Sequence, residues 1–229
     1  MESVSMNIIA RMHSDFPEKF GIPRQSGLVE TLESTIVFEP EYRNADALRG
    51  LDDFSHLWII WQFSKAVKNE WSPTVRPPRL GGNTRMGVFA TRSPFRPNHI
   101  GLSSVKILRI EHTDEYGTVI RVAGADLMDG TPIFDIKPYI PYCDSHPDAT
   151  GGFTSTAGSY ILDVDITPDQ LTKFPQNKQE ALLGLLSHDP RPSYQHDNDR
   201  IYGIAFCGYN IRFCVRNKTL IVKEIEKIN

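Results

Sequence analysis

The sequence is constrained most by a series of short apolar segments, each followed by turn residues and too short for a long helix. The segments that predict strands cover residues 6–11, 34–39, 54–63, 85–91, 102–110, 118–123 and 132–137. Side chains alternate between apolar and polar most clearly in the fifth and sixth segments, which is typical of a half-buried strand. Many short strands with little helix between them favour an antiparallel β-barrel over a doubly wound parallel sheet of the Rossmann type.

One short helix interrupts the strands. Asn44 is suited to cap its first turn, and Gly50 follows its last predicted residue. Asparagine accepts a hydrogen bond from the backbone at a helix start, and glycine adopts the left-handed conformation that ends many helices. We therefore expect a single helical turn or two between these residues.

The pattern changes after residues 145–159, which are rich in Gly, Ser, Thr, Pro and Asp and predict a loop or a domain boundary. Thr167 followed by Pro168 and Gln170 predicts a capped helix. Asn177 repeats the capping signal before an apolar run. Two short helices are expected in this part of the chain.

A terminal hairpin is predicted from strands at 209–216 and 220–223, joined by a turn at 217–219. The predicted fold is thus mainly β, of the α+β kind. We expect an N-terminal β-barrel domain at 1–147 and a small C-terminal α+β domain at 148–229.

Composition excludes several classes of protein. The chain is 40% hydrophobic and 23% charged, which is typical of a soluble globular protein. Its longest apolar run, residues 57–61, cannot span a membrane, and the first 20 residues do not resemble a signal peptide. Three cysteines without a C-x-x-C pair predict a reducing, cytoplasmic location with neither a disulfide framework nor a zinc site.

Common catalytic signatures do not occur in the sequence. It has no G-x-x-x-x-G-K-[ST], G-x-G-x-x-G, G-x-S-x-G or H-E-x-x-H motif, and its seven histidines are scattered. Three large enzyme classes and the common zinc proteases therefore lose their usual sequence support. We expect no metal ion.

Charge is distributed unevenly along the chain. Residues 71–110 contain seven cations and no acid, although average composition predicts about five acids in 40 residues. This basic segment carries +7, and the remaining residues carry −10, so the net charge of −3 conceals it. The basic segment favours anion binding. The alternative is that acids from elsewhere in the fold neutralise these cations.

Two parts of the basic segment combine arginine with proline. Arg76 and Arg79 lie in a stiff stretch that ends in two glycines, and Arg92 and Arg96 lie in a second proline-rich loop, 91–98. The arginine fork matches pairs of phosphate or carboxylate oxygens. A proline-rich turn with solvated cations is the competing interpretation of the second loop.

Three further motifs carry polar chemistry. Asp126 and Asp129 flank a predicted turn, where they bind a diol or an ammonium group or, more simply, cap the turn's own amides. Asp135 and Lys137 share one strand face, which we place inside the barrel, with a simple ion pair as the alternative. Residues 189–194 hold an arginine between prolines with a tyrosine nearby, suited to stacking a base beside a phosphate; a packed tyrosine corner is the competing account.

Together these motifs resemble the TsaA-like family. The resemblance rests on GIPRQ (21–25), Gly50-Leu51, FSHLW (54–58), VRPPRLGGNTRMGVFATRSPFRPN (75–98), Gly101-Leu102-Ser103, DLMDGTP (126–132) and DIKPYIPY (135–142). It covers residues 7–145, and DPRPSY with the terminal hairpin extends it towards the C-terminus. Matches of this length and order are highly specific.

The resemblance implies a methyltransferase that uses S-adenosylmethionine on a β-barrel and works as a homodimer. The implied substrate is the threonylcarbamoyl-modified adenosine beside the anticodon of threonine tRNA, methylated on its exocyclic nitrogen. The implied cofactor contacts are Pro23, Arg24, Gln25, Ser64, Lys65, Arg92, Leu102, Asp126, Leu127, Met128 and Asp129. Many relatives carry histidine and a polar residue where this chain has Ser64-Lys65, which puts any chemical role of that histidine in doubt here.

The catalytic residues do not follow from the sequence. Transfer to a weakly nucleophilic nitrogen calls for a base or a polarising cation, and Asp126 and Lys137 are the respective hypotheses. We expect Arg76, Arg79, Arg96, Arg191 and Tyr194 to bind the tRNA anticodon stem-loop, with Tyr142 as a second stacking candidate. The alternatives are an RNA-binding barrel without activity, or a methyltransferase acting on another RNA or a small molecule.

Overall fold

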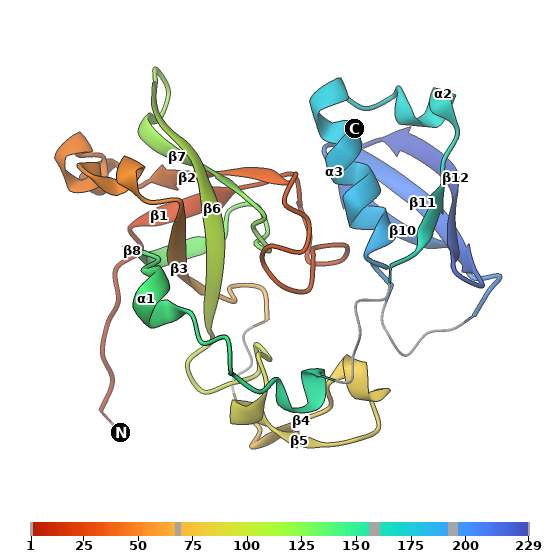
Figure 1. The fold of residues 1–229 in the computed structure, drawn as a ribbon, viewed down its shortest axis with the longest axis horizontal. Helices are drawn as coiled ribbons and strands as arrows, with labels where there is room; N and C mark the ends of the chain where they lie inside the picture. The colour runs from red at the N-terminus through yellow and green to blue at the C-terminus, as the bar shows by residue number, and fades with distance from the viewer. Residues whose placement is uncertain (1, 67–69, 156–160, 192–196, 229) are drawn as a thin grey trace.

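The protein is mainly β, as predicted, and its strands form a barrel, a four-stranded sheet and a small two-stranded sheet, joined by loops and short helices (Figure 1). This computed structural model describes residues 2–66, 70–155, 161–191 and 197–228. The barrel and the two-stranded sheet lie within residues 10–138, and the four-stranded sheet lies in the C-terminal third of the chain.

Six strands from the N-terminal part of the chain close into an antiparallel barrel in the order β1, β2, β7, β6, β3 and β8. Their bounds are β1 Ala10–His13, β2 Glu33–Phe38, β3 His56–Gln62, β6 Ile100–Thr113, β7 Gly117–Ala123 and β8 Pro132–Pro138. In β3 the buried side chains are Leu57, Ile59 and Trp61, because successive residues of a strand face opposite sides. The alternation that the sequence predicts therefore sets which side chains fill the barrel.

Five predicted barrel strands are confirmed, and the first begins four residues later than predicted, at Ala10. The strand predicted at 85–91 is wrong. Only β5 (Met86–Gly87) forms there, and it pairs with β4 (Thr74–Val75) before the chain turns into the 3₁₀ helix η5 (Val88–Ala90). Val88 is buried and Phe89 is 72% exposed, and both lie in the 3₁₀ helix and not in a strand.

Strands β4 and β5 belong to an arm that projects from the barrel (Figure 1). Between them lies the 3₁₀ helix η4 (Pro78–Leu80), which ends at Gly81 with a φ of +71°. The two prolines and the glycine pair thus form a compact turn, because proline fixes φ and glycine tolerates the left-handed region.

Short helices fill the remaining connections of the N-terminal half. They are η1 (Pro40–Tyr42), η2 (Ala45–Leu48), η3 (Leu51–Asp53) and α1 (Pro141–Asp144). The side chain of Asn44 accepts a hydrogen bond of 3.0 Å from the backbone N–H of Asp46, and Gly50 has a φ of +82°. The predicted cap at Asn44 is confirmed. The helix that follows is 3₁₀, one turn long and ends with Arg49 as its C-cap, so Gly50 lies one residue beyond it and precedes η3.

The C-terminal region contains a four-stranded sheet in the order β10, β11, β12 and β9, with β9 parallel to β12. The bounds of its elements are η6 Gly152–Thr154, β9 Asp163–Asp165, α2 Pro168–Leu171, α3 Gln176–Ser187, β10 Tyr202–Phe206, β11 Tyr209–Arg216 and β12 Thr219–Lys227. The predicted hairpin is confirmed and is longer than predicted, since β12 continues to Lys227.

The capping predictions in this region have different outcomes. Thr167 and Gln170 form the predicted capping box, with hydrogen bonds of 3.3 and 3.0 Å. The cap predicted at Asn177 is wrong, because α3 already begins at Gln176 after Pro175. Pro175 occupies the position just before the helix, where its lack of an N–H costs no helical hydrogen bond. Asn177 therefore lies inside the first turn, two residues after the actual cap position.

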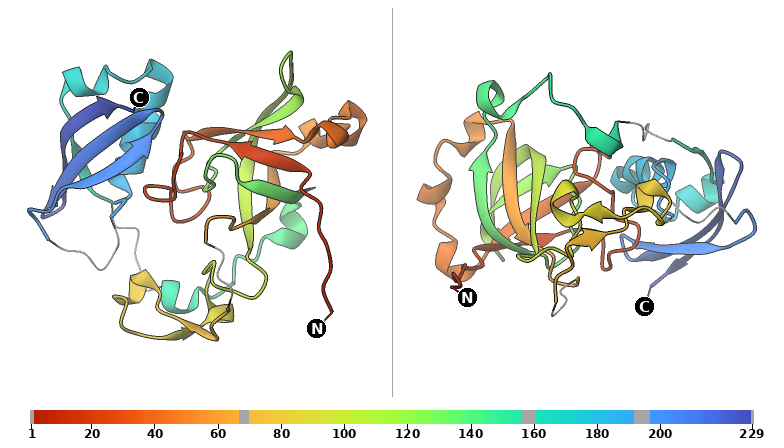
Figure 2. Two further views of the ribbon diagram at one scale, coloured as in Figure 1. Left: turned by 180° about the vertical axis from the view of Figure 1, so that it is seen from behind. Right: turned by 90° about the horizontal axis from the view of Figure 1, so that it is seen from below.

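The protein has two apolar cores, one inside the barrel and one in the C-terminal region, and the second also contains residues from the N-terminal part of the chain. The barrel core contains residues such as Ile36, Leu57 and Ile133. The C-terminal core is built on α3 and its sheet, but it also contains Phe16, Val29 and Leu32 from the long loop between β1 and β2. This loop lies between the barrel and the C-terminal sheet in every view (Figures 1 and 2).

No helix in the described part of the chain is long and apolar enough to cross a membrane. The cysteines Cys143, Cys207 and Cys214 are all unbridged. Within the described ranges, no group of three or more histidine, cysteine or acidic side chains is arranged to hold a metal ion.

Candidate functional site

A cavity of about 810 Å³ opens at one rim of the barrel. Its walls come from residues 22–25 of the β1–β2 loop, residues 61–66 at the end of β3, the proline-rich loop before β6, the start of β6, and Asp126 with Met128 after β7. Segments far apart in the sequence meet here because the ends of neighbouring barrel strands lie together. Binding residues are commonly carried by loops at such a rim.

Trp61 forms part of the apolar wall. It lies opposite Gly101 in the β3–β6 register, and a Cβ at residue 101 would stand only 2.3 Å from the indole. Glycine is therefore required for the indole to lie across β6. Phe63 packs against the indole with ring centroids 4.3 Å apart, and Leu102, which is 54% exposed, continues the wall.

A chain of hydrogen bonds connects this wall to a half-buried carboxylate, that of Asp126. The indole Nε1 of Trp61 donates to Ser103 Oγ at 3.0 Å, and Ser103 Oγ donates to Asp126 Oδ1 at 2.6 Å. Burial raises the pKa of the Asp126 carboxyl above its ordinary value. The hydrogen bond from Ser103 acts in the opposite direction, because it stabilises the charged form.

Arginines on the rim are oriented by neutral oxygens. Arg92 donates to the side-chain oxygen of Gln25, whose amide in turn donates to the Arg24 carbonyl. Arg96 donates to the Thr91 carbonyl at 3.1 Å. These acceptors hold the guanidinium groups in place without cancelling their charge, so the rim stays positive near Asp126.

The loop that carries Arg92 and Arg96 is held by its own hydroxyl groups. Thr91 Oγ1 accepts from the Ser93 backbone N–H at 3.2 Å, and Ser93 Oγ accepts from the Phe95 N–H at 3.2 Å. His99 Nδ1 contacts the Pro94 carbonyl at 2.8 Å. Such side-chain turns, with prolines between them, restrict the loop strongly.

The C-terminal region contacts the cavity through Arg24, a cavity residue of the β1–β2 loop. Its Nη2 donates to the carbonyl of Arg191 at 2.9 Å and to that of Asp189 at 3.3 Å. The guanidinium of Arg191 is 8% exposed and forms two bonds to the Asp189 carboxylate, at 2.8 and 2.9 Å. Arg191 is thus a buried support for Arg24, and its predicted contact with tRNA stays a prediction.

Most of the residues predicted to contact a cofactor line this cavity. They are Pro23, Arg24, Gln25, Ser64, Lys65, Arg92, Leu102, Asp126 and Met128. Leu127 is not among the lining residues, since its side chain is buried in the barrel core. Asp129 also lies apart and accepts a hydrogen bond of 3.1 Å from the N–H of Ser14, which belongs to the β1–β2 loop and not to the turn that contains Asp129.

The prediction that Lys137 lies inside the barrel is wrong. In β8 the neighbouring Ile136 packs against the barrel core, so Lys137 faces outward. Lys137 and Asp135 do share a face, and they form an ion pair of 2.9 Å there. The outer face does not border the cavity.

The residues predicted to bind tRNA are dispersed. Arg96 lines the cavity, Arg76 is exposed on the arm, and Arg79 lies in η4 with a side chain outside the described part. Tyr194 falls within 192–196, also outside the described residues. Tyr142 is 90% exposed on α1.

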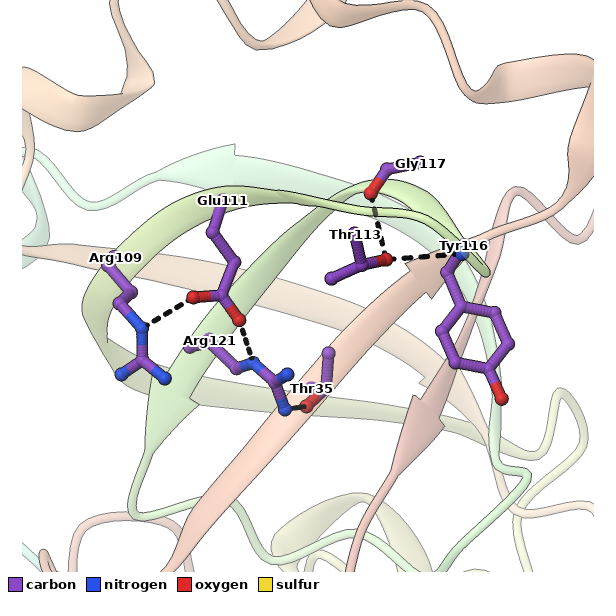
Figure 3. Close-up of polar contacts among 7 residues, drawn as sticks. All are labelled: Thr35, Arg109, Glu111, Thr113, Tyr116, Gly117 and Arg121. Atoms are coloured by element: carbon purple, nitrogen blue, oxygen red, sulfur yellow. Dashed lines mark hydrogen bonds and ion pairs between the residues drawn. The ribbon is translucent and has the colours of Figure 1, made fainter.

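One cation of the basic segment is neutralised. Arg109 lies 2.7 Å from Glu111, which also binds Arg121 at 2.6 Å, on the outer hairpin of β6 and β7 (Figure 3). These hydrogen bonds hold the pKa of the Glu111 carboxyl below its ordinary value. Among the described side chains, no other cation of the basic segment forms an ion pair, so the charge of the segment largely persists in the fold.

Sequence reasoning assigned no role to Trp61 or Ser103. The available signal was Ser103 itself, a small polar residue at an inward position of a strand. Such a residue needs a hydrogen-bond partner when buried.

Two family models together match most of the chain. The model of the tRNA-methyltransferase O N-terminal domain matches residues 11–145, and that of the TrmO C-terminal domain matches residues 161–228. The chain belongs to the TrmO family.

Relatives of the TrmO family resemble the chain over its whole length. The tRNA (adenine(37)-N6)-methyltransferase of Escherichia coli K12 is 39% identical over 99% of both chains. The crystal structure of TrmO from Pseudomonas aeruginosa superposes with a TM-score of 0.78 at 29% identity, covering 98% of this chain and all of that one. A Pyrococcus abyssi protein named a "probable S-adenosyl-L-methionine-binding protein" is 35% identical over 59% of this chain and 68% of its own length.

Proposed function

We propose that the protein is an S-adenosylmethionine-dependent methyltransferase that methylates N6 of adenosine 37 in tRNA. The observation that carries the proposal is a rim cavity in which a half-buried carboxylate, Asp126, lies near arginines that keep their charge. The names of the E. coli and P. abyssi relatives agree with this activity and this cofactor. The resemblance of the sequence extends the proposal to the threonylcarbamoyl-modified base in threonine tRNA.

The lining residues fit S-adenosylmethionine in size and chemistry. A volume of about 810 Å³ lies within the range of roughly 300–1,000 Å³ that small-molecule sites occupy. Arg92 would bind the carboxylate of the methionine part, while Trp61 and Leu102 would cover its apolar surfaces. Pro23, Arg24, Gln25, Ser64, Lys65 and Met128 complete the proposed contacts. The bound cofactor supplies a methyl group on a positively charged sulfur.

Asp126 is the proposed base. The exocyclic nitrogen of the modified adenosine carries a proton and is a weak nucleophile until that proton leaves. A carboxylate with a raised pKa accepts such a proton more readily than an ordinary one. As the nitrogen–carbon bond forms and the carbon–sulfur bond breaks, the proton passes to Asp126. The other cavity residues hold the two reacting atoms in line.

The tRNA is proposed to approach the same rim. Arg76, Arg79 and Arg96 would contact phosphates of the anticodon stem-loop, and Tyr194 would stack a splayed base. We further propose that 1–147 carries the cofactor site, that 148–229 supports it and contributes to tRNA binding, and that the protein works as a homodimer in the cytoplasm.

The direct test is methylation of unmethylated tRNA by the purified protein. The tRNA comes from a strain that lacks the gene, and mass spectrometry of its nucleosides follows the methylated form of threonylcarbamoyladenosine. We expect this nucleoside to appear only with protein and S-adenosylmethionine together. Absence of calorimetric heat with S-adenosylmethionine would support an RNA-binding barrel instead, and methylation of a different nucleoside would support another RNA substrate.

Replacing Asp126 by Asn tests the base. We expect turnover to fall at least about 100-fold, which is the usual contribution of a general base, with the affinity for S-adenosylmethionine nearly unchanged. The activity of the unmodified protein should increase with pH as Asp126 loses its proton, at a pH above that of an ordinary aspartate, because burial raises its pKa. Unchanged turnover in the variant removes Asp126 from the chemistry.

A further inference from the structure

We propose that Ser103 is a positioning residue for methyl transfer, holding the carboxylate of Asp126 through a hydrogen bond whose direction Trp61 fixes. The inference rests on the proposed function and assigns a role to two residues that do not carry charge. It follows from the chain of contacts between the indole of Trp61, the hydroxyl of Ser103 and Asp126.

The direction of these hydrogen bonds is determined by chemistry. An indole N–H only donates, so Ser103 Oγ must accept at 3.0 Å from Trp61. Its own proton is then available for one acceptor, and Asp126 Oδ1 lies 2.6 Å away. The contact of 2.6 Å is typical of a hydroxyl bound to a charged carboxylate. The Ser103 hydroxyl is thereby held in a single orientation.

Burial makes the arrangement costly to replace. Ser103 is 1% exposed and Trp61 is 8% exposed, so water has little access to either polar group. The indole is itself immobilised, because Gly101 leaves the space that it occupies. A hydrogen bond inside such a site is stronger than at the surface, and an unpaired group there is unfavourable.

The consequence for Asp126 is twofold. One carboxylate oxygen has a fixed donor, which sets the plane of the carboxyl group and leaves further lone pairs to accept a proton. The same donor favours the charged form, and so opposes the effect of burial on the Asp126 pKa. The positive charge of Arg92 and the backbone N–H groups of Asp126 and Ser26 act in the same direction as Ser103. Ser103 therefore influences both the geometry and the protonation of the proposed base.

The test compares three variants by their kinetics and pH profiles. In Ser103→Ala we expect kcat to fall about 10-fold or more, the KM for S-adenosylmethionine to stay within about twofold, and the acidic limb of the kcat profile to move to higher pH. Ser103→Thr returns the hydroxyl and should restore most of the activity. Ser104→Ala, the same change at the next position of β6 on the opposite face, should match the unmodified protein.

Several outcomes would overturn the inference. They are an unchanged kcat in Ser103→Ala, an unshifted pH profile, or a loss in Ser103→Thr equal to that in Ser103→Ala. If circular dichroism shows that Ser103→Ala is unfolded, Trp61→Phe decides by its pH profile. This variant removes the N–H together with part of the indole ring, so the shift of the acidic limb to higher pH, and not a fall in kcat alone, is the result that supports the inference. Absence of methyltransferase activity in the wild-type protein would instead contradict the proposed function.

Discussion

Arginines at the cavity and arginines on the outer face of the barrel have different partners. Arg92 and Arg96 donate to an amide oxygen and a carbonyl, which are neutral. Arg109 and Arg121 both bind the carboxylate of Glu111 (Figure 3). The same side chain therefore provides a positive site in one place and a local ion pair in the other, and the charge of its partner decides which.

Arg191 resembles Arg109 and Arg121, because its partner is also a carboxylate, but its side chain is more deeply buried than theirs. Its ion pair with Asp189 is almost fully buried, and its carbonyl accepts from Arg24 at the cavity. The comparison thus predicts that removing a paired, buried arginine lowers stability, whereas removing an arginine of the cavity lowers ligand affinity.

The largest effect is expected for Arg191→Gln. Loss of one partner from a buried ion pair leaves the other charge uncompensated, which typically costs about 3–5 kcal/mol. We expect urea denaturation to show a decrease of about 3 kcal/mol in the free energy of unfolding. The exposed pair Arg212–Glu224 offers a matched control, since Arg212→Gln should change stability little. Equal effects in the two variants would contradict the distinction.

A smaller effect, on affinity, is expected for Arg92→Gln. Hydrogen bonds to charged groups contribute about 1.5–3 kcal/mol, so the Kd for S-adenosylmethionine should rise about 10- to 100-fold in calorimetry. The melting temperature should stay close to that of the unmodified protein. Arg109→Gln, the same substitution on the outer face, should leave the Kd unchanged, and a comparable rise in both would show that the contrast with the outer face does not hold.

The smallest effect concerns the salt dependence of tRNA binding. Each lost phosphate contact reduces the slope of log K against log salt by about one. We expect Arg96→Gln to reduce it by this amount, and Arg109→Gln to leave it unchanged, because Glu111 already neutralises that cation. Fluorescence anisotropy at several salt concentrations measures the slopes, and a flat response of the unmodified protein would contradict tRNA binding through phosphates.

The sequence predicted the elements whose signals are local. The capping box at Thr167 and the hairpin turn at Asn217 depend on a few neighbouring residues, and both are confirmed. The basic loop and the DLMDGTP motif also led to the cavity, through Arg92 and Asp126.

Predictions from the sequence are wrong where a structure depends on contacts between residues that are distant in the chain. The segment 85–91 is apolar enough for a strand, but its only strand partner among the described residues is the two-residue strand β4, so no larger sheet forms. Periodicity placed Lys137 and Asp135 on one face and could not tell the inner face from the outer one. The hydrogen bonds of Ser103 connect it to Trp61 and Asp126, which are distant in the sequence, so no local pattern predicts them.

The shared core has a consequence for how the chain is completed during synthesis. Phe16, Val29 and Leu32 leave the ribosome early, but the residues that cover them, such as Leu182 and Ile225, follow more than 140 residues later. Until then, the loop between β1 and β2 presents apolar side chains to solvent, to chaperones or to neighbouring chains. The segment that forms one wall of the cavity is thus fixed last, when the final strand β12 closes the C-terminal sheet.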